Sequence, residues 1–179
     1  MLKKILIAIA VIIVVFLVVV ALQPADYQVT RAETIAAPPE TVFAQVNNFH
    51  NWRAWSPWEK LDSDMERTFS GEPAGEGAVY AWSGNSDVGE GNMTITESRP
   101  NDLIRLKLEF IKPMAGTSDT EFNFKPEGGG THVTWSMSGK NGFVGKMFCL
   151  FMNMDKMVGG QFEEGLASMK NVAEAEAKQ

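Results

Sequence analysis

The pattern of hydrophobic and polar positions divides the chain into an apolar N-terminal run and a longer mixed segment. Ile5 to Leu22 is an unbroken apolar stretch of 18 residues that follows Lys3 and Lys4. A helix of this length spans about 27 Å, close to the hydrocarbon thickness of a bilayer. The run therefore predicts a membrane anchor. A signal peptide cleaved after Val19-Val20-Ala21 and a buried core helix are the alternatives.

The charges beside the apolar run predict its orientation. Lys3 and Lys4 are the only charged side chains before it, and cationic flanks stay on the cytoplasmic side of a membrane. We expect a single-pass protein with a cytoplasmic N-terminus and a periplasmic or extracellular domain. A cleaved signal would also export the domain. Residues 1–24 are assigned to the anchor (or signal) and a short tether, and residues 25–179 to one domain.

Most of the chain beyond the run alternates with a period of two, which is typical of strands. Each predicted strand has one apolar and one polar face, as expected of an antiparallel sheet covered on one side. Gly128-Gly129-Gly130 predicts a hairpin turn between the last two strands. The predicted strands cover residues 27–35, 65–70, 77–83, 89–99, 104–110, 117–125 and 131–138.

Helical spacing occurs in three places. A short helix is predicted at 40–46, a second short helix or loop at 49–55, and one long helix at 145–177, where apolar residues recur every three or four positions. Gly159-Gly160 inside the long helix suggests a close backbone approach or a bend. The order of strand, short helices, further strands and a long helix predicts an α+β architecture.

Composition narrows the possible partners. The chain has a net charge of −6, which becomes −8 without Lys3 and Lys4. This acidic balance argues against nucleic-acid binding, because nucleic acids bind to clustered Lys and Arg, and against a domain lying flat on anionic lipid. Cys149 is the only cysteine, so the domain has no internal disulfide and depends on its core.

Three segments resemble a known superfamily. They are Ala37 to Phe43 (APPETVF), Trp52 to Trp58 (WRAWSPW) and Phe162 to Lys170 (FEEGLASMK). On these segments and the order of elements, the chain resembles the START-like or SRPBCC superfamily, which includes polyketide cyclase/dehydrase-like proteins. The resemblance implies a helix-grip fold, a curved antiparallel β-sheet wrapped around a long C-terminal α-helix, here preceded by one N-terminal transmembrane helix.

The resemblance also implies an elongated apolar cavity between that helix and the concave sheet. We expect it to bind an apolar small molecule or lipid, and a filled core is the alternative. Asp155 interrupts the apolar stripe of the helix, so it either reads a polar end of the ligand or points into water. The candidate ligand-binding residues are Trp55, Trp58, Trp82, Phe110, Phe122, Phe124, Trp135, Phe151, Met154, Asp155, Val158 and Phe162.

Evidence for catalysis is thin. The two histidines, His50 and His132, lie far apart in the sequence, and no nucleophile or carboxylate pair accompanies them. No residue is assigned as catalytic, no metal ligands are assigned and no cofactor is expected. A cyclase/dehydrase-like enzyme acting on a hydrophobic substrate is the second hypothesis, and a protein-interaction module of the cell envelope is the third. The oligomeric state is left open.

Overall fold

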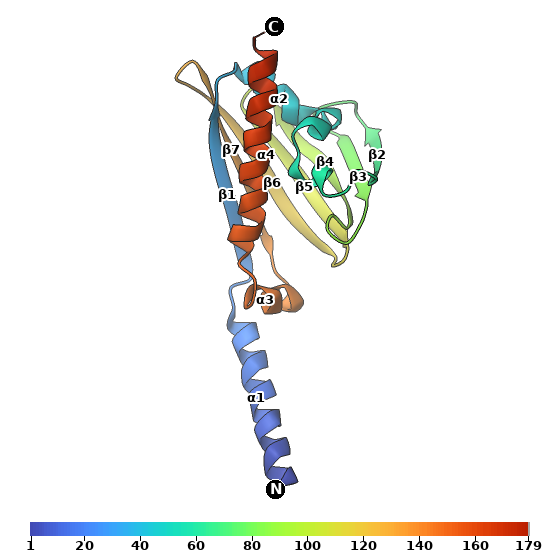
Figure 1. Cartoon of the computed structure of the whole chain (residues 1–179), viewed down its shortest axis with the longest axis vertical. Helices are drawn as coiled ribbons and strands as arrows, with labels where there is room; N and C mark the ends of the chain where they lie inside the picture. Colours follow the sequence, from blue (N-terminus) through green and yellow to red (C-terminus); the bar gives the residue numbers. More distant parts are fainter. Residues whose placement is uncertain (179) are drawn as a thin grey trace.

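The computed structural model describes residues 1–178 as an N-terminal helix followed by one α+β domain. Helix α1 (Leu2–Leu22) projects away from the domain and is long and apolar enough to cross a membrane (Figure 1). Three residues separate it from strand β1 (Asp26–Ile35). The remaining strands are β2 (Glu66–Gly71), β3 (Ala78–Ser83), β4 (Glu90–Arg99), β5 (Leu103–Lys112), β6 (Gly116–Glu127) and β7 (Gly130–Lys140).

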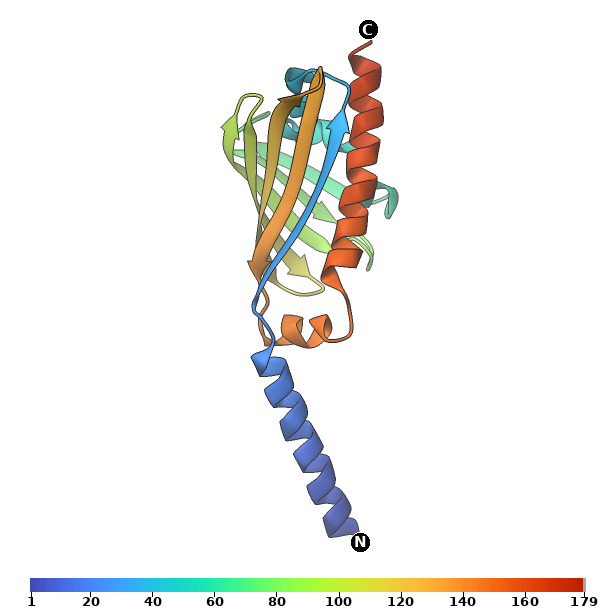
Figure 2. The ribbon, with the colours of Figure 1, turned by 90° about the vertical axis from the view of Figure 1, so that its left-hand side faces the viewer.

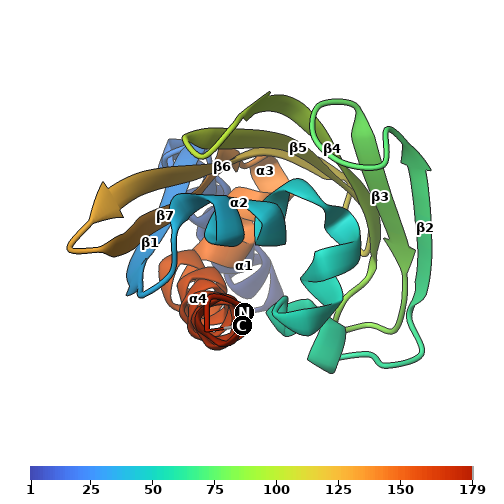
Figure 3. The ribbon, with the colours of Figure 1, turned by 90° about the horizontal axis from the view of Figure 1, so that it is seen from above.

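The seven strands form one antiparallel sheet in the order β1-β7-β6-β5-β4-β3-β2. Seen from above, the sheet curves around the short helical segments, and the C-terminal helix lies beside β1 at the open side (Figure 3). Alternate residues of each strand face the concave side, where apolar side chains gather. The predicted helix-grip fold is confirmed.

Helix α2 (Pro39–Asn47) and two 3₁₀ helices, Phe49–Ala54 and Pro57–Lys60, occupy the concave side. The last carbonyl groups of a helix need partners from outside it. The indole Nε1 of Trp52 donates to the carbonyl of Val46, at 3.0 Å. The indole Nε1 of Trp55 donates to the carbonyl of Gln45, also at 3.0 Å. These tryptophans therefore fold the segment after α2 back onto its own end.

The C-terminal helix α4 (Met154–Glu176) crosses the concave side next to β1 (Figure 2). Its second half is anchored by apolar side chains, since Phe162, Leu166 and Met169 are all buried. Near its start, an added Cβ at Gly159 would overlap the guanidinium of Arg31, which projects from β1. The predicted close approach at Gly159-Gly160 is therefore found at Gly159, where glycine lets Arg31 lie against the helix.

The long predicted helix is divided in two. Helix α3 (Phe143–Cys149) ends near Leu150, and α4 begins after Asn153, whose side chain accepts a hydrogen bond from the backbone N–H of Lys156. Asparagine is a favoured residue at a helix N-cap. The prediction of one continuous helix over 145–177 is therefore wrong, because a new helix starts at Asn153.

Candidate functional site

The deep part of the concave face is filled by aromatic rings. Trp135 of β7 stacks on Phe162 of α4 with ring centroids 4.0 Å apart, and on Phe122 of β6 at 4.8 Å. Trp58 meets Trp135 edge-on at 5.9 Å, and Trp55 does so at 5.7 Å. Such contacts fill the space between α4 and the centre of the sheet. The elongated cavity that the resemblance implied is therefore occupied by side chains here.

Several candidate ligand-binding residues belong to this packed region. Trp55, Phe122, Phe124, Trp135 and Phe162 are all buried with 2% or less of their surface exposed. The indole Nε1 of Trp135 is buried without a hydrogen-bond partner among the described residues. A buried donor without an acceptor is destabilising, so this indole carries a cost that the surrounding ring packing has to offset. On their burial, we place the five residues in the core.

The concave face becomes less buried toward the end of the sheet where β1 begins. Across the sheet, the row containing Ile95 and Leu106 is buried. In the next row, Met93 of β4 pairs with Leu108 of β5. In the row after that, Gly91 of β4 lies between Trp82 of β3 and Phe110 of β5. Four large apolar side chains of these two rows are half-buried, although they lie on the concave side. We call these four the half-buried patch: Trp82, Met93, Leu108 and Phe110.

Backbone geometry fixes the central aromatic residue of this patch. An added Cβ at Gly91 would overlap the indole of Trp82, so the ring lies directly against the glycine. The indole Nε1 donates to the carbonyl of Val88 at 3.0 Å, and Phe110 meets the ring edge-on at 6.2 Å. Trp82 thus presents a fixed apolar surface with its polar atom already satisfied.

An ionic cluster adjoins the patch. Glu59 accepts hydrogen bonds from Arg67 at 2.8 Å and from the hydroxyl of Tyr80 at 3.1 Å. Burial and the charge of Glu59 raise the pKa of Tyr80 above its usual range, so the phenol stays protonated. Arg67 also donates to the carbonyl of Met65. The cluster's groups bond one another, so its evident role is to hold the segment carrying Trp58 against the sheet.

The start of α4 and the turn before it lie outside the packed region. Phe151 is 77% exposed and contacts Phe16 of α1, with ring centroids 6.5 Å apart. Asp155 points away from the sheet interior and pairs with Arg31 at 2.9 Å, which lowers the pKa of the carboxyl group. Phe151 is therefore exposed and does not face the sheet, and Asp155 points into water, which is one of the two alternatives stated for it. Met154 and Val158 are half-buried.

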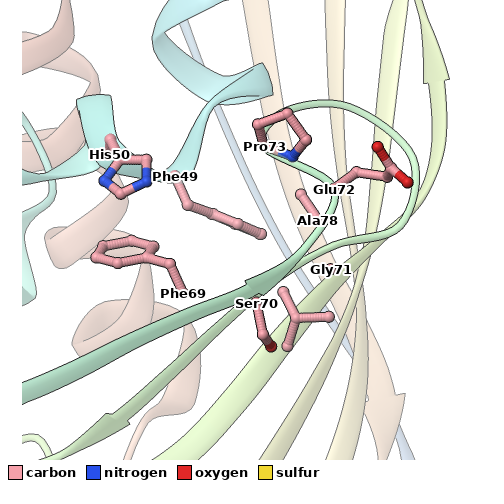
Figure 4. Close-up of a pocket in the computed structure, with 9 residues that line it drawn as sticks. Phe49, His50, Phe69, Ser70, Gly71, Glu72, Pro73 and Ala78 are labelled. Atoms are coloured by element: carbon pink, nitrogen blue, oxygen red, sulfur yellow. The ribbon is translucent and has the colours of Figure 1, made fainter.

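Two surface hollows lie elsewhere. One, of about 180 Å³, is lined by Phe49, His50 and Phe69 and by the turn that joins β2 to β3 (Figure 4). The other, of about 430 Å³, is lined by polar residues that include Asp26, Asp119 and Lys140. Apolar pockets for drug-sized ligands measure roughly 300–1,000 Å³. The first is smaller and the second is polar, and neither is lined by the half-buried patch.

The histidines are placed far from one another. The ring of His50 stacks on Phe69 at 4.0 Å, in the hollow of Figure 4. His132 Nδ1 lies 3.1 Å from the hydroxyl of Thr34 and 3.4 Å from a carboxylate oxygen of Glu127, at the far end of the sheet. Among residues 1–178, no three His, Cys, Asp or Glu side chains are grouped as metal ligands.

The sequence matches a family model described as polyketide cyclase / dehydrase and lipid transport, over residues 26–174. The chain belongs to this family. The match covers the sheet, the short helices and nearly all of α4, and it begins after α1. No curated protein sequence matches the chain.

Solved structures show the family's fold at low sequence identity. The Aha1 dimer from Colwellia psychrerythraea has a TM-score of 0.59 and 16% identity, covering 83% of this chain and 96% of that one. A protein from Rhizobium loti has a TM-score of 0.55 and 22% identity, covering 86% and 99%. The di-domain ARO/CYC StfQ from the steffimycin biosynthetic pathway has a TM-score of 0.62 and 9% identity, covering 87% of this chain and 53% of that one.

Met93 and Leu108 complete the half-buried patch and were absent from the candidate residues. Both lie on the strand face that also carries a predicted site residue, since Leu108 precedes Phe110 by two positions. The period of two therefore contained the signal for Leu108. Strand pairing then identifies Met93 as its neighbour, and pairing could not be deduced from the sequence.

Proposed function

We propose that this protein is a membrane-tethered, exported member of the family that binds an apolar small molecule or lipid against the half-buried patch. The observation that carries the proposal is that the rows of the concave face differ in how far their apolar side chains are buried. Deep rows are buried by protein, whereas Trp82, Met93, Leu108 and Phe110 stay half-exposed. Burying apolar surface contributes roughly 25 cal/mol per Å², so an apolar ligand covering this patch would be stabilised.

The helical side of the site supports this assignment. Val158 and Met154 of α4 are half-buried, and the first turn of α4 is attached to the sheet through the ion pair of Arg31 with Asp155. An ion pair whose carboxylate is exposed is screened by water and salt and contributes little to stability. The first half of α4 can therefore move aside at low cost and enlarge the space over the patch.

The membrane tether in this proposal is α1. Its apolar length matches a bilayer, and Lys3 and Lys4 precede the apolar run, which favours a cytoplasmic N-terminus. The short connection to β1 then keeps the domain at the outer surface of that membrane. A domain in this position meets apolar molecules dissolved in the bilayer.

Photo-crosslinking tests the binding site. Membranes containing the full-length protein are incubated with a diazirine-bearing fatty acid and irradiated, and the modified peptides are mapped by mass spectrometry. We expect adducts on β3, β4 and β5. The variant Leu108→Gln should lower their yield several-fold, whereas Lys107→Gln should not, because Lys107 is exposed on the opposite face of the same strand. Equal yields from the two variants, or adducts confined to helices, would contradict the proposal.

A further inference from the structure

Exposed apolar side chains of the domain are concentrated at one end. Within residues 23–178, and apart from Leu61, the exposed large apolar residues belong to α3, the segment after it and the start of α4, and to the end of β5 with the β5–β6 connection. The first group, which we call the apolar rim, consists of Phe143, Val144, Phe148, Phe151, Met152 and Met157. The second group is Ile111 and Met114.

Helix α3 has the composition of a core helix without its burial. Its sequence is FVGKMFC, yet none of its seven residues, all of which the structure describes, is buried. Folded domains rarely leave contiguous apolar surface open to water, and larger patches mark protein or membrane contacts. We therefore expect the apolar rim to be covered by a protein or a membrane.

The position of α3 relative to α1 identifies which of these covers the rim. Helix α3 lies crosswise at the end of α1 and beneath the sheet (Figure 2). The ammonium of Lys146 donates to the carbonyl of Ala21 at 3.2 Å, and Val20 is the only buried residue of α1. A side chain at the last turn of a membrane-spanning helix lies at the level of the lipid headgroups.

The depth of the rim can be estimated from α1 itself. The ring of Phe151 lies beside Phe16, which precedes Leu22 by six residues. At about 1.5 Å per residue, Phe16 lies roughly 9 Å inside the apolar helix. Amphipathic helices in the membrane interface bury their apolar face by roughly 5–10 Å. Phe151 therefore reaches the depth expected of an interfacial segment.

The charged residues beside the apolar rim are compatible with a position at the lipid headgroups. Residues 140–157 contain three lysines, Lys140, Lys146 and Lys156, and one acidic residue, Asp155, which is paired with Arg31. Basic side chains beside an apolar surface are attracted to lipid phosphates. The acidic composition of the whole chain, which argued against contact with anionic lipid, does not extend to residues 140–157, although Lys140 is paired with Asp26 of β1 at 3.8 Å.

We infer that the apolar rim is inserted into the outer leaflet of the membrane that α1 spans, as a second contact that fixes the domain upright on the bilayer. The inference rests on the proposed tether and adds a lipid-binding surface on the domain itself. With the rim in lipid, the edge of the sheet that carries the half-buried patch faces the bilayer, because the β5–β6 connection lies at the same end.

Depth-dependent quenching tests this inference on the full-length chain. In a Cys149→Ser background, the environment-sensitive dye NBD is attached to Val144→Cys or Met152→Cys in the rim. Ile12→Cys in α1 and Glu127→Cys at the far hairpin are the references. The protein is reconstituted into phosphatidylcholine/phosphatidylglycerol vesicles with nitroxide lipids, labelled either near the headgroup or near the methyl end of the acyl chain.

We expect dye at the two rim positions to lose most of its emission when the nitroxide is near the headgroup (shallow). Dye at Ile12→Cys should lose most of its emission when the nitroxide is near the end of the acyl chain (deep). Dye at Glu127→Cys should be quenched by neither. Rim positions that stay unquenched while Ile12→Cys is quenched would overturn the inference and leave the tether and the patch standing. An unquenched Ile12→Cys would instead show that the tether fails. Equal quenching at Glu127→Cys would also overturn the inference, because contact would not be confined to the rim.

A charge placed in the rim gives a second measurement. Phe151→Asp should shift the emission of dye at Val144→Cys toward the red and reduce its shallow quenching several-fold, because a carboxylate is expelled from lipid. The matched control is Leu61→Asp, which introduces the same charge at an exposed apolar residue away from the rim. Equal effects of the two aspartates would overturn the inference.

Discussion

The two halves of α4 are attached to the same sheet by different physical means. From Phe162 to Ala173 the helix is held by side chains with 1% or less of their surface exposed, stacked on rings such as Trp135. From Met154 to Gly160 it is held by Arg31, by the close approach at Gly159 and by Val158, which is only partly buried against the core. Apolar burial is strong and independent of salt, whereas an exposed ion pair is weak. The second half of the helix is therefore held more strongly than the first.

This difference assigns separate roles to the two ends of the concave face. The strongly held half closes the deep rows and maintains the fold. The weakly attached half lies toward the half-buried patch and the apolar rim, and a region of low local stability there would agree with the proposed binding site. In this member of a family described by both cyclase/dehydrase and lipid transport, the interior is filled at one end and its apolar side chains are half-buried at the other.

The comparison predicts its largest effect at Phe162. Truncation by Phe162→Ala leaves a cavity against Trp135, and we expect the free energy of unfolding to fall by about 3–5 kcal/mol. The matched variant Phe110→Ala, in the half-buried patch, should lower it by about 1–2 kcal/mol because less surface is removed from burial. Urea unfolding of the full chain in mild detergent, followed by tryptophan fluorescence, measures both. Equal losses would show that the two ends are packed alike.

A pair of glycines tests the attachment of the weaker half. An added Cβ at Gly160 would meet open space, so Gly160→Ala should raise the free energy of unfolding by up to about 1 kcal/mol through helix propensity. Gly159→Ala should raise the free energy of unfolding by less, because its Cβ would displace the Arg31 guanidinium. In an Arg31→Ala background, the two alanine substitutions should become equivalent. Persistent inequality there would mean that Arg31 is not the obstacle.

The smallest effect concerns Asp155. Replacing it by Asn should lower the free energy of unfolding only slightly at neutral pH, since water and salt screen the exposed carboxylate. Arg31 holds the pKa of Asp155 below the usual 3.8. The stabilisation from this ion pair is therefore fully present above pH 3.8, and it is lost as the pH falls through the lowered pKa of Asp155. Wild type and Asp155→Asn should converge well below pH 3.8, and a constant difference would contradict the ion-pair role.

The strands and the overall architecture could be predicted because one side of the sheet is covered. Alternation along β5, for example, separates buried Leu106 from exposed Lys107, and an inverted register would place every apolar residue in water. The one-helix prediction was wrong because apolar spacing continued through Phe148 and Phe151, which lie outside the core. A periodic stripe does not distinguish a core from a lipid surface. The N-cap residue Asn153 carried the missing signal.

The candidate site was harder to predict than the fold. The sequence could supply Trp82 and Phe110 as apolar residues on the concave face, but not whether Trp135 and Phe162 leave space between them. That outcome depends on ring packing at distances of 4.0 Å, which spacing along the chain does not encode. The segment Trp52 to Trp58, which carried the family resemblance, has a structural role, because the indoles of Trp52 and Trp55 donate to carbonyls at the end of α2.

The connection between α1 and β1 limits how far the domain can travel. It consists of Gln23, Pro24 and Ala25, and Asn141 of the neighbouring loop donates to the carbonyl of Ala25 at 2.8 Å. Three extended residues cover only about 10 Å. In the proposed arrangement, a connection this short would hold the domain against the bilayer that α1 spans. A ligand bound by the domain would then have to be exchanged at that bilayer and not at a distant membrane.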